Sequence, residues 1–431
     1  MSLAEQCQGL LGIASIFGLA YALSNNRKAI NLRLIVSGFI LQVILAVFIL
    51  KTDIGQQIFR TIGDGITSLL HFSDEGAKFV FGPLATDRLA ALVGNDARYI
   101  FAFRVVPTII FVSSLVSISY YTGLMQKAVE IVARVVAKVM GASGAEALSN
   151  AASVFVGQVE AQLLIKPYVP TMTRSELLAS MAGSMACVSG GVLAVYIGLG
   201  IKASYLLTAS VMAAPGALVI SKIIYPETQE SMTRGKVSIE VKRTAANIID
   251  AAAHGASEGL RIGLNVVAML IAFIALIFMC DAACGAIGAG LYNLGLRANG
   301  IGLDLAHLKI KDLFGVMFAP VAFLLGVPAR DISTVGMLMG EKIVINEFLA
   351  FTDLAEMVKE GVRTLSPKAE TIATFALCGF ANLSSVAMQI GGIGEIAPSR
   401  REDLAKLGLK ALLCGTMASY LSACLAGLLT N

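Results

Sequence analysis

Two short stretches, GQVE at 157–160 and INEF at 345–348, place an acidic side chain in the middle of apolar sequence. An amphipathic segment that ends in a glycine precedes each stretch, at Gly141 in the first half and at Gly326 in the second. The glutamate follows its glycine by 19 residues in the first half and by 21 in the second. Two such layouts in one chain predict an internal structural repeat.

The composition places this repeat in a membrane. Of 431 residues, 56% are hydrophobic and only 14% are charged, whereas an ordinary globular chain carries about 25% charged residues. Several apolar runs approach the roughly 20 residues that a helix needs to cross a bilayer. These runs include 34–50, 105–116, 205–224, 266–279 and 404–429. The chain is therefore predicted to be an all-α polytopic membrane protein.

Several other classes of protein are disfavoured. The net charge of +4 is not gathered in basic stretches with interleaved aromatics, so nucleic acid is not an expected partner. The seven cysteines form no CxxC pair, which argues against a zinc site or a disulfide framework. The three histidines are scattered and no nucleophile or phosphate-loop motif is present, so an enzyme is not expected.

The segments around the two glutamates are too polar and too short to span. Each arm of about 16 to 20 residues, rising about 1.5 Å per residue, would pass the bilayer centre and turn back. We therefore expect two re-entrant hairpins, 141–170 and 331–366. Small and polar residues interrupt the span that follows each hairpin, at 185–192 and 378–385, and this pattern predicts broken helices.

The basic residues Arg27, Lys28 and Arg33 follow the first apolar segment, which predicts an outside amino terminus and a cytoplasmic loop. Counting spans from there puts the two hairpins on opposite sides, so the two halves are predicted to be inverted. Amphipathic patterns at 54–72 and 127–140 predict helices that lie in the membrane interface.

The expected organisation has five parts. Residues 1–100 hold the N-terminal helices, an interfacial helix and an external segment, and 101–225 form the first inverted repeat. A polar cytoplasmic linker, 226–247, joins it to the sixth transmembrane helix and an external loop, 248–307. Residues 308–431 form the second inverted repeat.

Glu160 and Glu347 are the strongest candidates for function. A carboxylate at membrane depth costs about 2.5–3.5 kcal/mol on insertion scales unless it is paired or solvated. Their matching places in inverted halves predict one shared polar site, although each could instead be a structural hydrogen-bond hub for its own hairpin. Neutral donors and acceptors surround them and favour a neutral, polyhydroxylated solute. They are Gln158, Asn346, Asn382, Ser384 and Ser385.

Five stretches in order are similar to the concentrative nucleoside transporter family, and the resemblance covers essentially the whole chain. They are SNNRKAI at 24–30, FAFRVVP at 101–107, GQVE at 157–160, NEF at 346–348 and CGFANLSS at 378–385. The resemblance implies eight transmembrane helices, two inverted hairpins and a homotrimer in a bacterial inner membrane. It also implies a scaffold, to which residues 1–100 belong, and a transport domain that moves like an elevator. No cofactor is expected apart from a coupling ion.

The resemblance also assigns residues to a nucleoside, uridine being one expected substrate. Gln158 and Glu160 would face the nucleobase directly or through water, and Val192 would line the apolar side of its pocket. Val159 stands where many members have Ser or Thr, which leaves the purine or pyrimidine preference open. Gln162 replaces a frequent Pro, with no consequence that the sequence predicts.

For the sugar, the resemblance implies that Glu347, Asn382 and Ser385 hold the ribose hydroxyls beside Phe380. This agrees with the residue types, because carboxylate and amide groups bind vicinal hydroxyls without requiring a charged substrate. From the sequence alone, Phe380 could stack on a flat ligand or simply pack in the core.

The coupling ion is left between H⁺ and Na⁺. Ser153 occupies the position of an Asn that serves the sodium site in sodium-coupled members, and Cys187 replaces a Ser. Sodium prefers hard oxygen ligands, for which a thiol is a poor substitute. We therefore favour H⁺, with one of the two glutamates as its carrier. Ser153, Val156 and Val188 remain candidate sodium ligands through hydroxyl and carbonyl oxygens.

Three other functions remain alternatives. A transporter of amino acids or dicarboxylates could use the same hairpins, but no basic residue lies within 157–165 or 379–393 to meet an acidic solute. An intramembrane enzyme would turn over its substrate without a gradient. A passive channel could not accumulate solute uphill.

Overall fold

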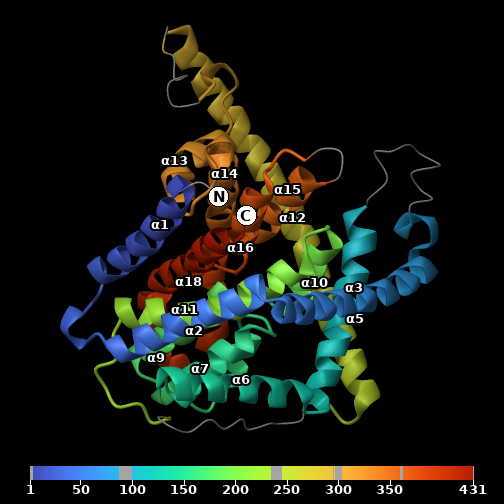
Figure 1. Cartoon of the computed structure of the whole chain (residues 1–431). Helices are drawn as coiled ribbons and strands as arrows, with labels where there is room; N and C mark the ends of the chain where they lie inside the picture. The colour runs from blue at the N-terminus through green and yellow to red at the C-terminus, as the bar shows by residue number, and fades with distance from the viewer. Residues whose placement is uncertain are drawn as a thin grey trace.

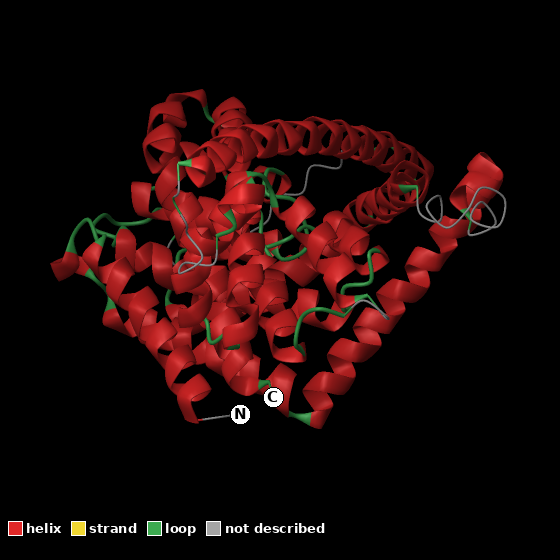
Figure 2. Cartoon of the chain, turned by 90° about the horizontal axis from the view of Figure 1, so that it is seen from above, coloured by secondary structure: helices red, strands yellow, loops and turns green. Residues whose placement is uncertain are grey.

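The computed structural model describes residues 3–86, 100–233, 245–294, 296, 303–359 and 363–430. Every regular element within these ranges is a helix (Figure 2). Parts of the predicted external segment, cytoplasmic linker, external loop and second hairpin fall outside the described residues. These parts are 87–99, 234–244, 297–302 and 360–362.

The N-terminal part consists of α1 (Leu3–Ala22), α2 (Leu32–Lys51) and α3 (Asp53–Phe81). Thr52 alone separates α2 from α3, and its hydroxyl accepts a hydrogen bond from Gly55 N at 3.0 Å, which starts the new helix. The amphipathic helix predicted at 54–72 is thus confirmed as a helix and continues for nine further residues. It exposes large apolar side chains beside buried small ones, as expected of a helix in contact with lipid.

The first repeat begins with α5 (Phe101–Tyr121) and α6 (Leu124–Met140). Gly123 separates the two helices, because its φ of 79° breaks the helical backbone. The helices that follow are α7 (Gly144–Ser153), α8 (Glu160–Leu163), α9 (Arg174–Ala186), α10 (Gly190–Gly198) and α11 (Ala203–Ile224).

The second repeat has the same order of elements. Its amphipathic helix α13 ends before Gly326, which has a φ of 85°, and a hairpin, a broken helix and a long helix follow. The helices are α13 (Ile310–Leu324), α14 (Ile332–Val344), α15 (Glu347–Val358), α16 (Pro367–Leu377), α17 (Leu383–Ile396) and α18 (Arg401–Leu429). The 46-residue α12 (Ile248–Asn293) separates the repeats and runs across the molecule, while α18 lies at its centre (Figure 1).

Six helical stretches in the described part of the chain are long and apolar enough to cross a membrane. They are Leu32–Lys51, Ala102–Tyr121, Arg174–Gly198, Ala203–Ile224, Ile248–Asn293 and Pro398–Leu429. The shorter apolar part of α1 and the interrupted pair α16–α17 bring the number within the described residues to the eight that were predicted.

The two hairpins differ more than predicted. In the second, α14 and α15 have 13 and 12 residues, whereas in the first α7 has 10 and α8 only 4. No helix in either hairpin therefore reaches the expected arm length of about 16 to 20 residues, and α8 is the shortest. Pro167 and Pro170 explain the difference, because each lacks a backbone donor and its ring blocks a continuing helix.

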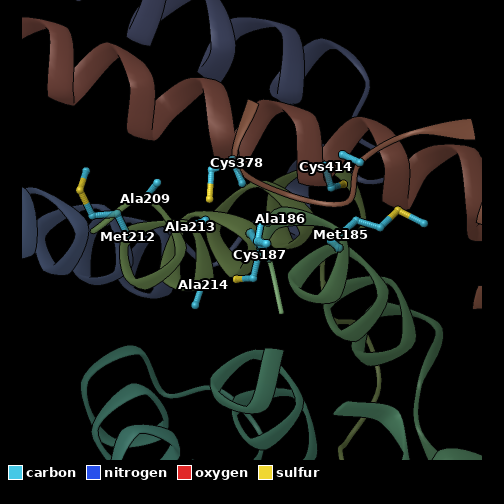
Figure 3. Packing of buried hydrophobic residues seen from close by; sticks show 14 of the residues in the cluster. Met185, Ala186, Cys187, Ala209, Met212, Ala213, Ala214, Cys378 and Cys414 are labelled. Atoms are coloured by element: carbon cyan, nitrogen blue, oxygen red, sulfur yellow. The ribbon is translucent and has the colours of Figure 1, made fainter. Parts of the chain in front are cut away.

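The breaks in the two broken helices cross each other at the core. The breaks are confirmed between Ala186 and Gly190 and between Leu377 and Leu383. Phe380 N donates to the carbonyl of Cys187 at 3.3 Å, so one break supplies a partner that the other needs. Figure 3 shows Cys187 beside Cys378, packed against small residues of α11.

This crossing generates a prediction for Gly379→Ala. Gly379 has a φ of 127°, and a Cβ there would lie 2.6 Å from Ala186 O and 2.8 Å from Met185 O. The strained backbone alone costs about 1–3 kcal/mol, so we expect a clearly lower Tm in detergent by thermal denaturation. Gly391→Ala is the control, since a Cβ there meets nothing within 4 Å and the site is helical. Equal Tm values for the two variants would contradict the close crossing.

Candidate functional site

Glu347 lies at the tip of hairpin 2 and is buried. Asn346 precedes it and caps α15, its Oδ1 accepting from Leu349 N at 2.9 Å, which fixes the first turn of the helix. Asn382 Nδ2 donates to Glu347 Oε2 at 2.7 Å, and the Tyr196 hydroxyl donates to Oε1 at 3.3 Å. Both carboxylate oxygens thus meet neutral donors from other elements. Tyr196 lies in an apolar stretch of the sequence, where no local pattern marks it as a site residue.

Asn382 joins this carboxylate to the second broken helix. As the cap of α17, its Oδ1 accepts from Ser385 N at 2.8 Å and from the Ser384 hydroxyl at 2.7 Å. The amide is therefore oriented with its nitrogen toward Glu347. A cap at a helix start inside the protein does two things here: it satisfies the helix end and presents a donor to the site.

Gln158, at the tip of hairpin 1, reaches the same group of residues. Its Nε2 donates to Ser385 Oγ at 3.2 Å and contacts Met388 Sδ at 3.7 Å. Its Oε1 is buried and has no hydrogen-bond partner among the described residues. Gln158, Ser385, Asn382 and Glu347 therefore form one chain of contacts between the two hairpin tips.

Lys342 is a fully buried cation in this region that the sequence analysis missed. Its Nζ donates to the carbonyl of Ala376 at 2.8 Å, and its charge acts on Glu347. The sequence did contain a signal for this cation. Lys342 precedes Glu347 by five residues in apolar sequence, and a buried charge needs compensation by an opposite charge or hydrogen bonds.

Glu160 is placed differently from Glu347. It is half-buried, and its carboxylate folds back over the hairpin tip, so that a Cβ on Gly157 would lie 2.1 Å from its Oε2. Its charged or polar neighbours include Tyr120 on α5 and Glu258 on α12. No hydrogen bond between described residues joins it to Glu347, so a direct role in the shared site stays a prediction.

The apolar candidates lie around the break crossing. Val192 is in the first turn of α10, one turn before Tyr196, so both project from the same helix face. Phe380 is half-buried at the crossing. Val159 packs on α17, since a Cβ on Gly392 would lie 2.8 Å from its Cγ1. Val192 and Phe380 thus border the polar chain. Val159, at the tip of hairpin 1, instead contacts α17 near Gly392.

Four positions correspond to the sodium site of sodium-coupled members, and they offer few oxygens that are not already hydrogen-bonded. The Ser153 hydroxyl donates to Ser149 O at 2.7 Å and contacts Ser184 Oγ at 3.0 Å. Cys187 Sγ donates to Ser210 O at 3.5 Å, so its thiol faces α11. Val156 and Val188 are buried and could contribute only carbonyl oxygens. Ser153 is therefore the only one of the four with a side-chain oxygen.

Gln162 is the centre of a buried network that the sequence did not predict. Its Nε2 donates to Ser184 Oγ at 2.7 Å and to Ser149 Oγ at 3.1 Å, and its Oε1 accepts from the Ser180 hydroxyl at 2.6 Å. The amide thereby ties hairpin 1 to α9 beside Ser153, and the hydroxyls there are already bonded to one another.

Three family models match the chain along its length. They are described as Na⁺ dependent nucleoside transporter N-terminus (residues 11–84), Nucleoside recognition (102–203) and Na⁺ dependent nucleoside transporter C-terminus (205–427). The matched segments follow one another as the N-terminal helices, the first repeat and the remainder of the chain.

Known relatives match over nearly the full chain. Nucleoside permease NupC of Helicobacter pylori is 39% identical over 97% of this chain and 96% of its own length. Sodium/nucleoside cotransporter 1 of Homo sapiens is 36% identical over 99% of this chain and 64% of its own length. CNTnw in an inward-facing substrate-bound state has 38% identity and a TM-score of 0.90, covering 98% of this chain and 97% of that chain.

The inverted hairpins, the crossed broken helices and the polar chain between them define a membrane transporter of small solutes rather than an enzyme. The chain belongs to the concentrative nucleoside transporter family.

Gln162→Ala tests the buried network. A typical buried hydrogen bond contributes about 0.5–1.5 kcal/mol, and this change removes three at once. Ser149, Ser180 and Ser184 then keep only their hydroxyl contacts with one another and with Ser153. We expect a lower Tm in detergent and faster proteolysis of hairpin 1. Gln57→Ala, at an exposed position of α3, is the matched control and should leave both unchanged. An unchanged Tm for Gln162→Ala would show that the network does not hold the hairpin.

Proposed function

We propose that this protein takes up nucleosides by cation-coupled secondary active transport with an elevator-type alternating-access mechanism. The observation that carries the proposal is the chain of contacts from Gln158 through Ser385 and Asn382 to Glu347. It joins the tips of two hairpins from opposite halves of the sequence. A solute bound there would touch both halves at once.

The chemistry of this chain suits a ribose. Ionised Glu347 accepts hydrogen bonds only, and vicinal hydroxyls can donate to it while accepting from the Asn382 amide. A ribose that takes the place of the Tyr196 contact at 3.3 Å leaves no buried group unpaired, because the two hydroxyls offer both a donor and an acceptor. Ser385, already bonded to Gln158, is positioned to hold the second hydroxyl.

The base would lie on the side of hairpin 1. The unpartnered Gln158 Oε1 is an acceptor for a base N–H. Val192 and Phe380 supply apolar surface for the flat ring, with Glu160 reached directly or through water and Val159 at the far end. Uridine is the first substrate to test. An acidic solute gains little here, since Lys342 already donates to a backbone carbonyl.

Conformational change is supported by the similarity to CNTnw, which is known in inward-facing, intermediate and outward-facing states, all matching this chain at TM-scores from 0.89 to 0.92. We assign the hairpins, the broken helices and the long helices α11 and α18 to the moving transport domain. The N-terminal helices with α5 and α12 form the scaffold, within the five parts set out above.

The scaffold also supports a homotrimer in the bacterial inner membrane. The buried residues of α12 are one alanine and four glycines, and its large apolar side chains are exposed in the single chain. An apolar face of this length needs lipid or another subunit.

For the coupling ion we favour H⁺. The hydroxyls around Ser153 already bond to one another and to Gln162, so sodium would have to break that network to gain ligands. Na⁺ is the alternative, favoured by the description of the family model as Na⁺ dependent. If protons drive transport, Glu347 or Glu160 is the first candidate carrier.

Uptake of radiolabelled uridine into proteoliposomes separates the two ions. One elementary charge moved through about 100 mV supplies about 2.3 kcal/mol, enough for a roughly fifty-fold gradient of solute. We expect accumulation with a proton gradient in sodium-free buffer and its loss when a protonophore is added. Uptake that survives the protonophore at fixed sodium would reject H⁺ in favour of Na⁺, and equilibration without accumulation would indicate a channel.

Glu347→Gln tests the ribose contact. Removing one hydrogen bond to a charged group costs about 1.5–3 kcal/mol, so uridine should bind at least roughly ten-fold more weakly by calorimetry in detergent. Glu402→Gln, which alters an exposed pair with Lys406, is the control and should bind like the wild type. 2′-Deoxyuridine should lose less affinity than uridine on this change. Unaltered uridine binding by Glu347→Gln would contradict the assignment.

A further inference from the structure

A second group of charged side chains lies on hairpin 2, apart from the proposed substrate site. Lys311 of α13 forms ion pairs with Glu341 of α14, at 2.7 Å between Nζ and Oε1, and with Asp353 of α15. Lys342, the neighbour of Glu341, points instead toward α16, where it donates to Ala376 O. The two faces of α14 thus carry two different charged clusters.

The charges in this cluster do not balance. Two carboxylates share one ammonium, so the fully ionised cluster carries a net charge of −1. The side chain of Glu341 is 0% exposed, and its Oε2 has no hydrogen-bond partner among the described residues. A buried, unpartnered carboxylate oxygen is costly when ionised. One added proton would bring the net charge of the cluster to zero, so that the buried carboxyl would no longer have to be ionised.

Among the described residues, no other ion pair supplies the missing positive charge. Around the start of α13, Asp281 of α12 accepts from Ile310 N and Asp312 accepts from Lys309 N, so both carboxylates cap the helix start. They add negative charge to this end of α13. Lys342 lies on the opposite face of α14, where it donates to the carbonyl of Ala376.

We propose that Glu341 and Asp353, bridged by Lys311, form a proton-binding site on hairpin 2. A proton from water forms an O–H bond on a Glu341 or Asp353 oxygen, and the ion pair with Lys311 keeps the other carboxylate ionised. The side chains of Lys311 and Asp353 are 26% and 20% exposed, so the cluster is open on their side while Glu341 stays enclosed. The site deepens the proposed function, on whose proton coupling it rests.

The site is placed to act on the hairpin. Lys311 bridges the two arms, because Glu341 belongs to α14 and Asp353 to α15. The Glu341 carbonyl also accepts from Ile345 N at 2.9 Å, directly before the tip that carries Asn346 and Glu347. Protonation loosens one of the two ion pairs to Lys311, so it changes how firmly the arms are held beside the bound solute.

Infrared difference spectroscopy during a pH titration of the purified protein tests the site without any transport. The wild type should show a protonated-carboxyl band that forms as the pH is lowered. Glu341→Gln and Asp353→Asn should each lose that band, because either leaves one carboxylate for one ammonium. Glu130→Gln, which alters an ion pair with Arg134 on α6, is the matched control and should keep it.

Transport measurements then connect the site to coupling. In both cluster variants, exchange of labelled for unlabelled uridine across proteoliposomes without a gradient should continue. Accumulation driven by a pH gradient should be lost. Lys311→Gln, which leaves two carboxylates without their cation, should instead move the pH dependence of uptake to higher pH. A purely structural role would lower exchange and accumulation together in every variant.

Two results would overturn the proposal: a carboxyl band that persists in both Glu341→Gln and Asp353→Asn, or unchanged pH-driven accumulation in these variants. The failure of the proposed function looks different. If the wild type neither binds nor exchanges uridine, substrate assignment fails while the infrared titration still reports on the cluster. If the wild type accumulates uridine with sodium alone, proton coupling fails and this site is rejected with it.

Discussion

A helix that breaks inside a membrane leaves backbone N–H and C=O groups that no lipid can satisfy, and the rest of this structure depends on how that constraint is met. Here two breaks cross, and Phe380 N bonds to the carbonyl of Cys187. The new helix starts are capped by Ser189 and Asn382. The two breaks approach each other closely, so only small residues fit between them: Gly379 and the alanines of α11 pack there (Figure 3).

The same constraint explains why site residues double as structural ones. Asn382 caps α17 with its oxygen, which leaves its nitrogen free to donate to Glu347. Asn346 caps α15 and so fixes the carboxylate that follows it. A site made from helix caps is rigid, because moving either side chain would also leave a buried helix end unsatisfied. Such preorganisation lowers the entropy cost of binding a small polar solute.

The sequence predicted whatever follows from local pattern. Apolar runs, the glycines at 141 and 326, and carboxylates at matching depths gave the order of elements and the two breaks. It failed where a partner comes from a distant helix: Tyr196 reaches Glu347 across 151 positions, and no periodicity reports that. Gln162 was noticed only as a replacement for proline, because its three serine partners lie on two other helices. The short second arm of hairpin 1 is the exception, because Pro167 and Pro170 are local signals that a helix cannot continue there.

Hairpin 2 places its two charge clusters back to back, and this arrangement bears on how coupling can work. Lys342 and Glu347 face the broken helix and the proposed sugar site, whereas Glu341 faces α13. A symporter binds its ion and its solute together, which is simplest when they occupy different atoms. It must still let one sense the other. Adjacent residues on one short helix meet both conditions: the sites are chemically separate, yet a change in the packing of α14 alters both.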